Sequence, residues 1–254
     1  MIFSLPTYST LFWITAVLAI FLVGVSKAGF GGGTGLIATP LLALTIPVAD
    51  AAALLLPLLI VADLLSIYHY RHTFDRRIIR LMVPAAVVGI VVGALLFNAF
   101  SQNDRVLKVG IGLLSILFVL FDLFRTQIFA HLAEKRPSDG MGVLLSSIAG
   151  FTSTLAHAGG PPATMYLLPL QLPRQIFVGT SVLFFTAVNL IKLIPYSFLG
   201  LLRVGNLTTI LILAPLAYLG VRAGVYLNGR FTDKWFNRLI YVLLFLTGVQ
   251  LMLG

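Results

Sequence analysis

Cysteine is absent from the 254 residues of the chain, and charged side chains are scarce. The lack of Cys excludes disulfide frameworks, thiolate metal sites and cysteine nucleophiles. Only 10% of the residues are charged, whereas about a quarter are charged in an average soluble domain. Apolar residues make up 59% of the chain, which leaves too little polar surface for a soluble fold and too much apolar surface for a disordered one. The composition therefore predicts an all-α, polytopic membrane protein.

Apolar runs recur along the chain at close to the length of a membrane-spanning helix, which needs about 20 residues. They cover residues 8–26, 48–68, 81–100, 106–124, 175–199, 204–227 and 239–253. The first run is too long for a secretory signal and has no basic residues before it, so we expect it to be retained as a helix. Breaks rich in Gly or Pro at residues 29–35 and 156–162 predict broken or re-entrant helices.

The two halves of the chain resemble each other. An offset of 126 residues superposes Gly24 on Gly150, Gly33 on Gly159, Pro47 on Pro173 and Asp63 on Asn189. An offset of 131 superposes Pro84 on Pro215, Gly89 on Gly220 and Gly93 on Gly224. Apolar sequences match by chance mainly at residues such as Leu, so matched Gly and Pro carry more weight. We therefore predict a first transmembrane repeat at residues 1–124, a linker at 125–139 and a second repeat at 140–254.

Positive charge is distributed unevenly among the loops. Eleven of the 17 basic residues fall at Arg174 or within residues 69–80, 125–136 and 228–238. The positive-inside rule places these segments, and with them the linker, in the cytoplasm. Each repeat then has an odd number of segments, about five, so the two repeats are inverted in the membrane and both termini are external. Inverted repeats with interrupted helices are typical of secondary transporters.

The two breaks are the strongest candidates for a binding site, because non-helical backbone survives in a bilayer only around a cavity. Glycines permit positive φ, so successive amides of the first break can converge on an anion and the short helix that follows can be capped. In the second break, Gly159 and Gly160 suit the interruption, with positive φ expected at Gly159, and the prolines suit a first helical turn. The alternative is that the glycines only allow close helix packing. The residues expected to form this site are Gly31, Gly32, Gly33, Thr34, Gly159 and Gly160.

The sequence KAGFGGGTGLIATPLLAL at residues 27–44 and its degenerate echo GFTSTLAHAGGPPATMYLLPL at 150–170, together with the twofold pattern of spans, resemble the TauE/SafE family of sulfite exporters. The resemblance covers nearly the whole chain. It implies export of sulfite, sulfonates or related small anions across a bacterial inner membrane, with the external termini in the periplasm.

Ionisable side chains within membrane segments are rare and usually functional. Lys27 and Lys192 are candidates for holding an anion, and Asn189 joins them because it occupies the position equivalent to Asp63. The alternative for each lysine is a snorkelling anchor. Asp63 is a candidate for proton coupling or, alternatively, a structural partner of a basic residue. His157 can exchange protons or donate to an oxyanion, or it can serve only in packing.

The sequence thus predicts a proton-coupled secondary carrier that exports a small anion, with sulfite or an organosulfonate implied by the resemblance. The alternatives are a carrier for a carboxylate or an amino acid, an anion channel, or a membrane scaffold. Neither H-E-x-x-H nor G-x-S-x-G is present, so an enzyme is not expected, and no cofactor or metal is implied. The expected partners are the substrate anion, protons and the bilayer, with a homodimer left open. Nucleic acid is not expected, because no basic run is interleaved with aromatic residues.

Overall fold

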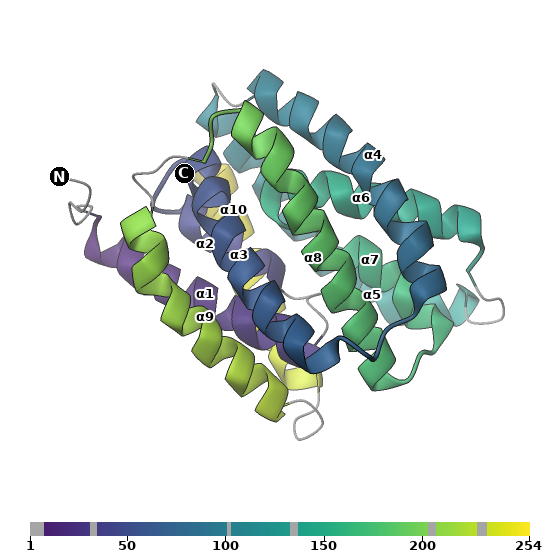
Figure 1. The fold of residues 1–254 in the computed structure, drawn as a ribbon. Helices are drawn as coiled ribbons and strands as arrows, with labels where there is room; N and C mark the ends of the chain where they lie inside the picture. The colour runs from purple at the N-terminus through teal and green to yellow at the C-terminus, as the bar shows by residue number, and fades with distance from the viewer. Residues whose placement is uncertain (1–7, 31–34, 101–102, 133–136, 203–206, 228–232) are drawn as a thin grey trace.

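The computed structural model describes residues 8–30, 35–100, 103–132, 137–202, 207–227 and 233–254, and within these ranges every regular element is helical (Figure 1). Among the described residues, six helices are long and apolar enough to cross a membrane: α1, α3, α4, α5, α8 and α9. The prediction of an all-α polytopic membrane protein is confirmed. The elements are α1 (Thr10–Phe30), η1 (Gly35–Ile37), α2 (Ala38–Ala43), α3 (Val48–Tyr70), α4 (Arg76–Phe100), α5 (Asp104–Leu132), α6 (Asp139–Ala156), α7 (Gly160–Leu167), η2 (Leu168–Leu170), α8 (Arg174–Phe198), α9 (Leu207–Leu227) and α10 (Asp233–Leu253).

Several helices extend beyond the apolar runs that predicted them, and α4 and α5 show two ways in which this happens. Helix α4 begins at Arg76 rather than at residue 81 because Asp75 caps it: the Asp75 Oδ1 accepts the backbone N–H groups of Arg77 at 2.8 Å and Ile78 at 3.1 Å. Helix α5 continues to Leu132, so the first part of the expected linker is helical. Hydropathy alone misses both extensions because polar residues at a helix end still satisfy the backbone hydrogen bonds.

Short helices follow both breaks, as the sequence predicted, and each leads to a long helix that starts after a proline. Helices α2 and α7 have six and eight residues. Pro47 (φ −54°) and Pro173 (φ −50°), which are 126 residues apart, directly precede α3 and α8. A proline has the right φ to enter a helix and lacks only a donor that the first turn would leave unpaired anyway. The two halves therefore share the same order of short and long helices.

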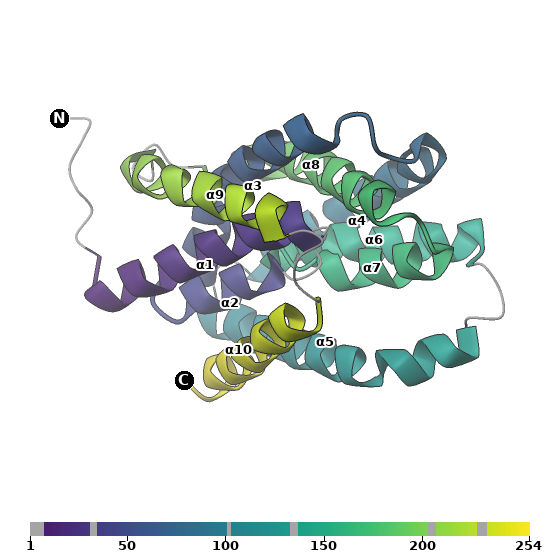
Figure 2. The same cartoon turned by 90° about the horizontal axis from the view of Figure 1, so that it is seen from below.

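The first helix of each half packs against a helix of the other half. Helix α1 lies along α9, and α6 lies along α4, as Figures 1 and 2 show. Glycine permits both close approaches: a Cβ on Gly24 would lie 2.8 Å from the Ala217 carbonyl oxygen, and a Cβ on Gly150 would lie 2.2 Å from that of Ala86. The first helix of each half therefore packs on the other half, so the buried core is shared between the two halves.

Helices α3 and α8 pack against each other and run in opposite directions. The Val48 N–H at the start of α3 donates to Asp104 Oδ1 at the start of α5, at 2.8 Å. The segment that follows α3 instead meets the beginning of α8, where the Asp75 N–H donates to Thr180 Oγ1 at 2.9 Å. The predicted inversion requires such an antiparallel pair. In Figure 2, α1 and α6 also approach the middle of the molecule from opposite ends. The orientation of the repeats across the membrane stays a prediction.

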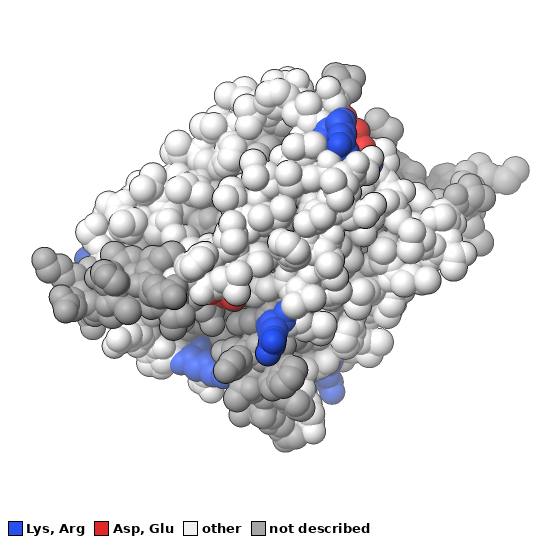
Figure 3. Space-filling model, turned by 180° about the vertical axis from the view of Figure 1, so that it is seen from behind, with Lys and Arg blue, Asp and Glu red and all other residues white. Residues whose placement is uncertain are grey.

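The surface of the described residues is dominated by uncharged side chains. Figure 3 shows one face on which Lys, Arg, Asp and Glu form only a few small patches. Large apolar side chains project outward, including Phe198 with 89% of its surface exposed and Leu253 with 76%. A monomeric soluble protein rarely exposes apolar side chains so widely, whereas lipid solvates them. The chain is therefore a multi-pass membrane protein.

Single cysteines test the predicted orientation without background, because the chain contains none. We expect His72→Cys and Gly140→Cys to react with an impermeant maleimide only from the cytoplasmic side. Asn103→Cys and Gly254→Cys should react only from the opposite side. All four positions are exposed. Labelling of residues 72 and 103 from the same side contradicts the inversion.

Candidate functional site

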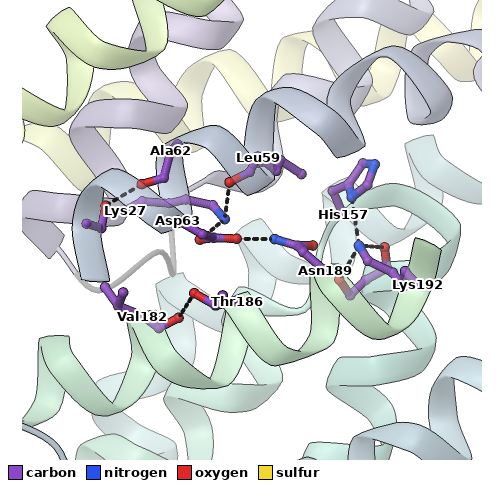
Figure 4. Close-up of polar contacts among 11 residues, drawn as sticks. Lys27, Leu59, Ala62, Asp63, His157, Val182, Thr186, Asn189 and Lys192 are labelled. Carbon is purple, nitrogen blue, oxygen red and sulfur yellow. Dashed lines mark hydrogen bonds and ion pairs between the residues drawn. The ribbon is translucent and has the colours of Figure 1, made fainter. Parts of the chain in front are cut away.

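A buried chain of polar side chains joins both halves at the centre of the bundle (Figure 4). Lys27 of α1 forms an ion pair with Asp63 of α3, and its Nζ also donates to the Leu59 carbonyl at 3.4 Å. The Nδ2 of Asn189, on α8, donates to the other oxygen of the Asp63 carboxylate at 2.6 Å. Both carboxylate oxygens therefore have a partner, and the hydrogen bond from Asn189 links the ion pair of the first half to α8 of the second.

Lys192 lies one turn beyond Asn189 on α8 and is completely buried. Its Nζ lies 3.0 Å from the Ser153 carbonyl oxygen, 2.9 Å from Ser153 Oγ and 2.8 Å from His157 Nδ1. An ammonium has three N–H donors, so these partners satisfy all of them. The side chain points into the bundle instead of snorkelling outward, and its three partners are uncharged.

His157 ends α6 and connects Lys192 to the other half of the chain. It adopts the left-handed conformation, with φ 52°, and its backbone N–H bonds back to Ser153. Its Nε2 lies 3.0 Å from the Ala52 carbonyl oxygen of α3. A carbonyl can only accept, so Nε2 carries the proton and Nδ1 is left to accept from Lys192. The contacts thus define one tautomer of a neutral imidazole.

Two buried tyrosines make equivalent hydrogen bonds in the two halves. The Tyr70 hydroxyl donates to the Ala28 carbonyl, and the Tyr196 hydroxyl donates to the Thr154 carbonyl, both at 2.8 Å. Donors and acceptors are each 126 residues apart, which matches the offset found in the sequence. Each tyrosine holds the end of α1 or α6 next to a residue of the polar chain. Sequence reasoning missed both tyrosines because an aromatic side chain in an apolar span resembles core, although the repeat offset pairs them.

The backbone conformation of Gly159 in the second break differs from the expected one. Gly159 precedes α7 with φ −74°, so the expected positive φ is wrong at this residue, and His157 adopts that conformation instead. A Cβ on Gly159 would lie 2.6 Å from the Ala149 carbonyl oxygen, so close packing is what requires glycine. Prolines occupy the first turn of α7, as predicted, but they lack N–H groups, so this helix end offers fewer donors to an anion than expected.

The structure brings five of the sequence candidates together: Lys27, Asp63, His157, Asn189 and Lys192. Gly159 lies beside them, since its added Cβ would also be 3.1 Å from Ser153 Cβ, and Gly160 begins α7. Gly31, Gly32, Gly33 and Thr34 lie outside the described residues. Ser153 of α6 contributes two of the three contacts of Lys192.

A cavity of about 320 Å³ opens near the starts of α4 and α6, where Arg77 and Asp139 form an exposed ion pair. A cluster of buried apolar side chains extends from this cavity to the polar chain. Ile78 and Tyr166 belong to both cluster and cavity, whereas Val188 of the cluster directly precedes Asn189. The cavity lining thus includes none of the polar-chain residues Lys27, Asp63, His157, Asn189 and Lys192.

Comparison with known proteins gives one match. The family model described as "Sulfite exporter TauE/SafE" matches residues 16–251, which include every residue of the polar chain. No curated protein and no solved structure matches the chain significantly.

The paired tyrosines give a prediction on stability. Tyr70→Phe and Tyr196→Phe each remove one buried hydrogen bond but keep the ring, so each should lower the free energy of unfolding by about 1 kcal/mol. The measurement is the thermal midpoint of the purified protein in detergent. Tyr68→Phe is the matched control, because Tyr68 is 72% exposed and should leave the midpoint unchanged. Midpoints equal to the control in both variants would show that the hydroxyls do not hold α1 and α6.

Proposed function

Because the chain belongs to the TauE/SafE family of sulfite exporters, and is thus a membrane transporter, we propose that it is a secondary carrier that exports sulfite or an organosulfonate. The observation that supports this most is Lys192, a fully buried lysine whose partners are all uncharged. Burying an ammonium without a counter-ion is costly. A small anion is the ligand that would compensate that charge. We place the carrier in a bacterial inner membrane with both termini outside.

The binding site we propose centres on Lys192, with Ser153, His157 and Asn189 around it. The Ser153 hydroxyl can rotate, so an anion oxygen can take its place as an acceptor of the Lys192 ammonium while the hydroxyl donates to the same anion. Asn189 uses Nδ2 on Asp63, and that nitrogen has a second N–H. Backbone amides of Gly31, Gly32, Gly33, Thr34, Gly159 and Gly160 complete the proposed site.

Proton coupling is assigned to Asp63, with His157 as the second candidate. In the structure, Asp63 is the counter-ion of Lys27. Protonation of Asp63 would remove that counter-charge and leave Lys27 free to attract an anion, so proton and anion binding would influence each other. Lys27 is thus a second anion-binding residue, used in the protonated form of the site.

Two other functions compete with this proposal. A carboxylate would satisfy Lys192 as well as a sulfonate, because charge and not sulfur is what the site recognises, and the choice of sulfur rests on the family. An amino acid also requires an acceptor for its ammonium, and both oxygens of Asp63 are already occupied, so a simple anion fits better. A channel differs from a carrier in showing flux that does not saturate with anion concentration.

The first test of the proposal is the affinity of Lys192 variants. Lys192→Gln should weaken sulfite binding by roughly 1–3 kcal/mol, the value of a charge-assisted hydrogen bond. Lys192→Arg should also bind more weakly, because a planar guanidinium does not replace a compact ammonium in a small site. Affinity is read from the ligand-induced shift of the thermal midpoint. Lys108→Gln, at a partly exposed ion pair with Asp104, is the control. Wild-type affinity in Lys192→Gln would reject this lysine as the anion-binding group.

The second test separates coupling from binding. Asp63→Asn should still bind the anion but lose the acceleration of flux by a pH gradient across liposomes. The amide is already present at the equivalent position, Asn189, so we expect the fold to accept it. Gradient-driven flux at the wild-type rate would exclude Asp63 as the coupling group, and His157→Gln would then be compared in the same assay.

A further inference from the structure

The net charge of the ionisable side chains in the polar chain determines which ligand charge the site can neutralise. We infer that the form of the site in which Lys27 and Asp63 are paired selects anions with a single negative charge over dianions of the same shape. This inference rests on the proposed function, because it describes the ligand of the same site. It follows from counting charges within the contacts shown in Figure 4.

His157 adds no charge to the count. Its Nε2 faces the Ala52 carbonyl and its Nδ1 faces the Lys192 ammonium. A doubly protonated imidazole would direct an N–H at an ammonium, which has no acceptor. The geometry therefore requires the neutral ring for as long as Lys192 is charged.

Lys27 and Asp63 together also add no charge. One is cationic and the other anionic, and they are in direct contact. Transfer of the proton from the lysine to the carboxylate would give two neutral groups with the same sum. The count is thus independent of where that proton lies.

Lys192 supplies the only net charge of the chain of contacts. Two of its partners, the Ser153 carbonyl oxygen and the His157 Nδ1, can only accept here, and the Ser153 hydroxyl oxygen can accept as well, so the surroundings offer one acceptor to each N–H of an ammonium. Among the contacts between described residues, the polar chain carries one net positive charge.

A single charge on the ligand brings the site to neutrality. A dianion leaves one negative charge uncompensated among buried apolar side chains, where solvation by water is lost. Both ligands meet the same hydrogen-bond donors, so charge balance decides between them. The preferred class is therefore a monoanionic sulfur oxyanion, such as a sulfonate or hydrogensulfite, and sulfate is disfavoured.

Methanesulfonate and sulfate test the inference directly, because they have similar tetrahedral shapes and differ by one charge. Calorimetric titration of the purified full-length protein should give a dissociation constant about a hundredfold lower for methanesulfonate, which is about 2.8 kcal/mol. Sulfate binding as tightly as methanesulfonate would overturn the inference and leave the proposed function intact. Binding of neither anion would contradict the proposed function, and the inference with it.

Two variants then change the charge count in a controlled way. Asp63→Asn raises the net charge to two, so the preference for methanesulfonate should shrink to less than about tenfold, or reverse. The double variant Lys27→Gln/Asp63→Asn returns the net charge to one and should restore the wild-type order. The double variant also controls for loss of the carboxylate itself. An unchanged ratio of the two dissociation constants in Asp63→Asn would show that charge balance does not set the preference.

Discussion

A lysine ammonium at the centre of an apolar bundle needs an acceptor for each of its three N–H groups, and this requirement organises the structure around Lys192. Ser153 supplies two acceptors and His157 the third. His157 reaches Lys192 because α6 ends there in a left-handed residue, which an uninterrupted helix would not allow. The end of α6 thus provides His157 as a hydrogen-bond acceptor for the buried Lys192 ammonium.

The twofold repeat that we predict would explain why the proposed site lies where it does. Residues at equivalent positions can touch only near the axis that relates them, and Asp63 and Asn189 meet in this way. Helices α1 and α6 approach that region from opposite ends, each held by an equivalent tyrosine. The two halves differ in where they carry a buried lysine. Lys27 of the first half lies on α1, whereas Lys192 of the second half lies on α8. The two halves therefore place different polar side chains at the centre of the bundle, as the proposed carrier with one anion site requires.

Much of the fold was predictable from sequence. Long apolar runs indicate membrane helices, and clusters of Gly and Pro indicate the breaks between them. The ends of α4 and α5 were not predictable, since capping by Asp75 and polar helical turns leave no hydropathy signal. Charges within apolar runs singled out Lys27, Asp63 and Lys192, but the pairing of Lys27 with Asp63 was not predictable, because it depends on how α1 packs against α3. The role of Gly159 was misjudged for a related reason: glycine marks close approach as often as positive φ, and only the position of the Ala149 carbonyl decides between them.

The most direct measurement of the central claim is nitrogen NMR of the five lysines of the chain, labelled at Nζ, during titration with methanesulfonate. The Lys192 signal, assigned by its loss in Lys192→Gln, should move with the ligand, because the anion replaces Ser153 Oγ as a partner of that ammonium. The Lys108 signal, from the ion pair with Asp104 at the start of α5, should stay in place. A Lys192 signal that does not move while calorimetry records binding would contradict the account, since the anion would then be held elsewhere.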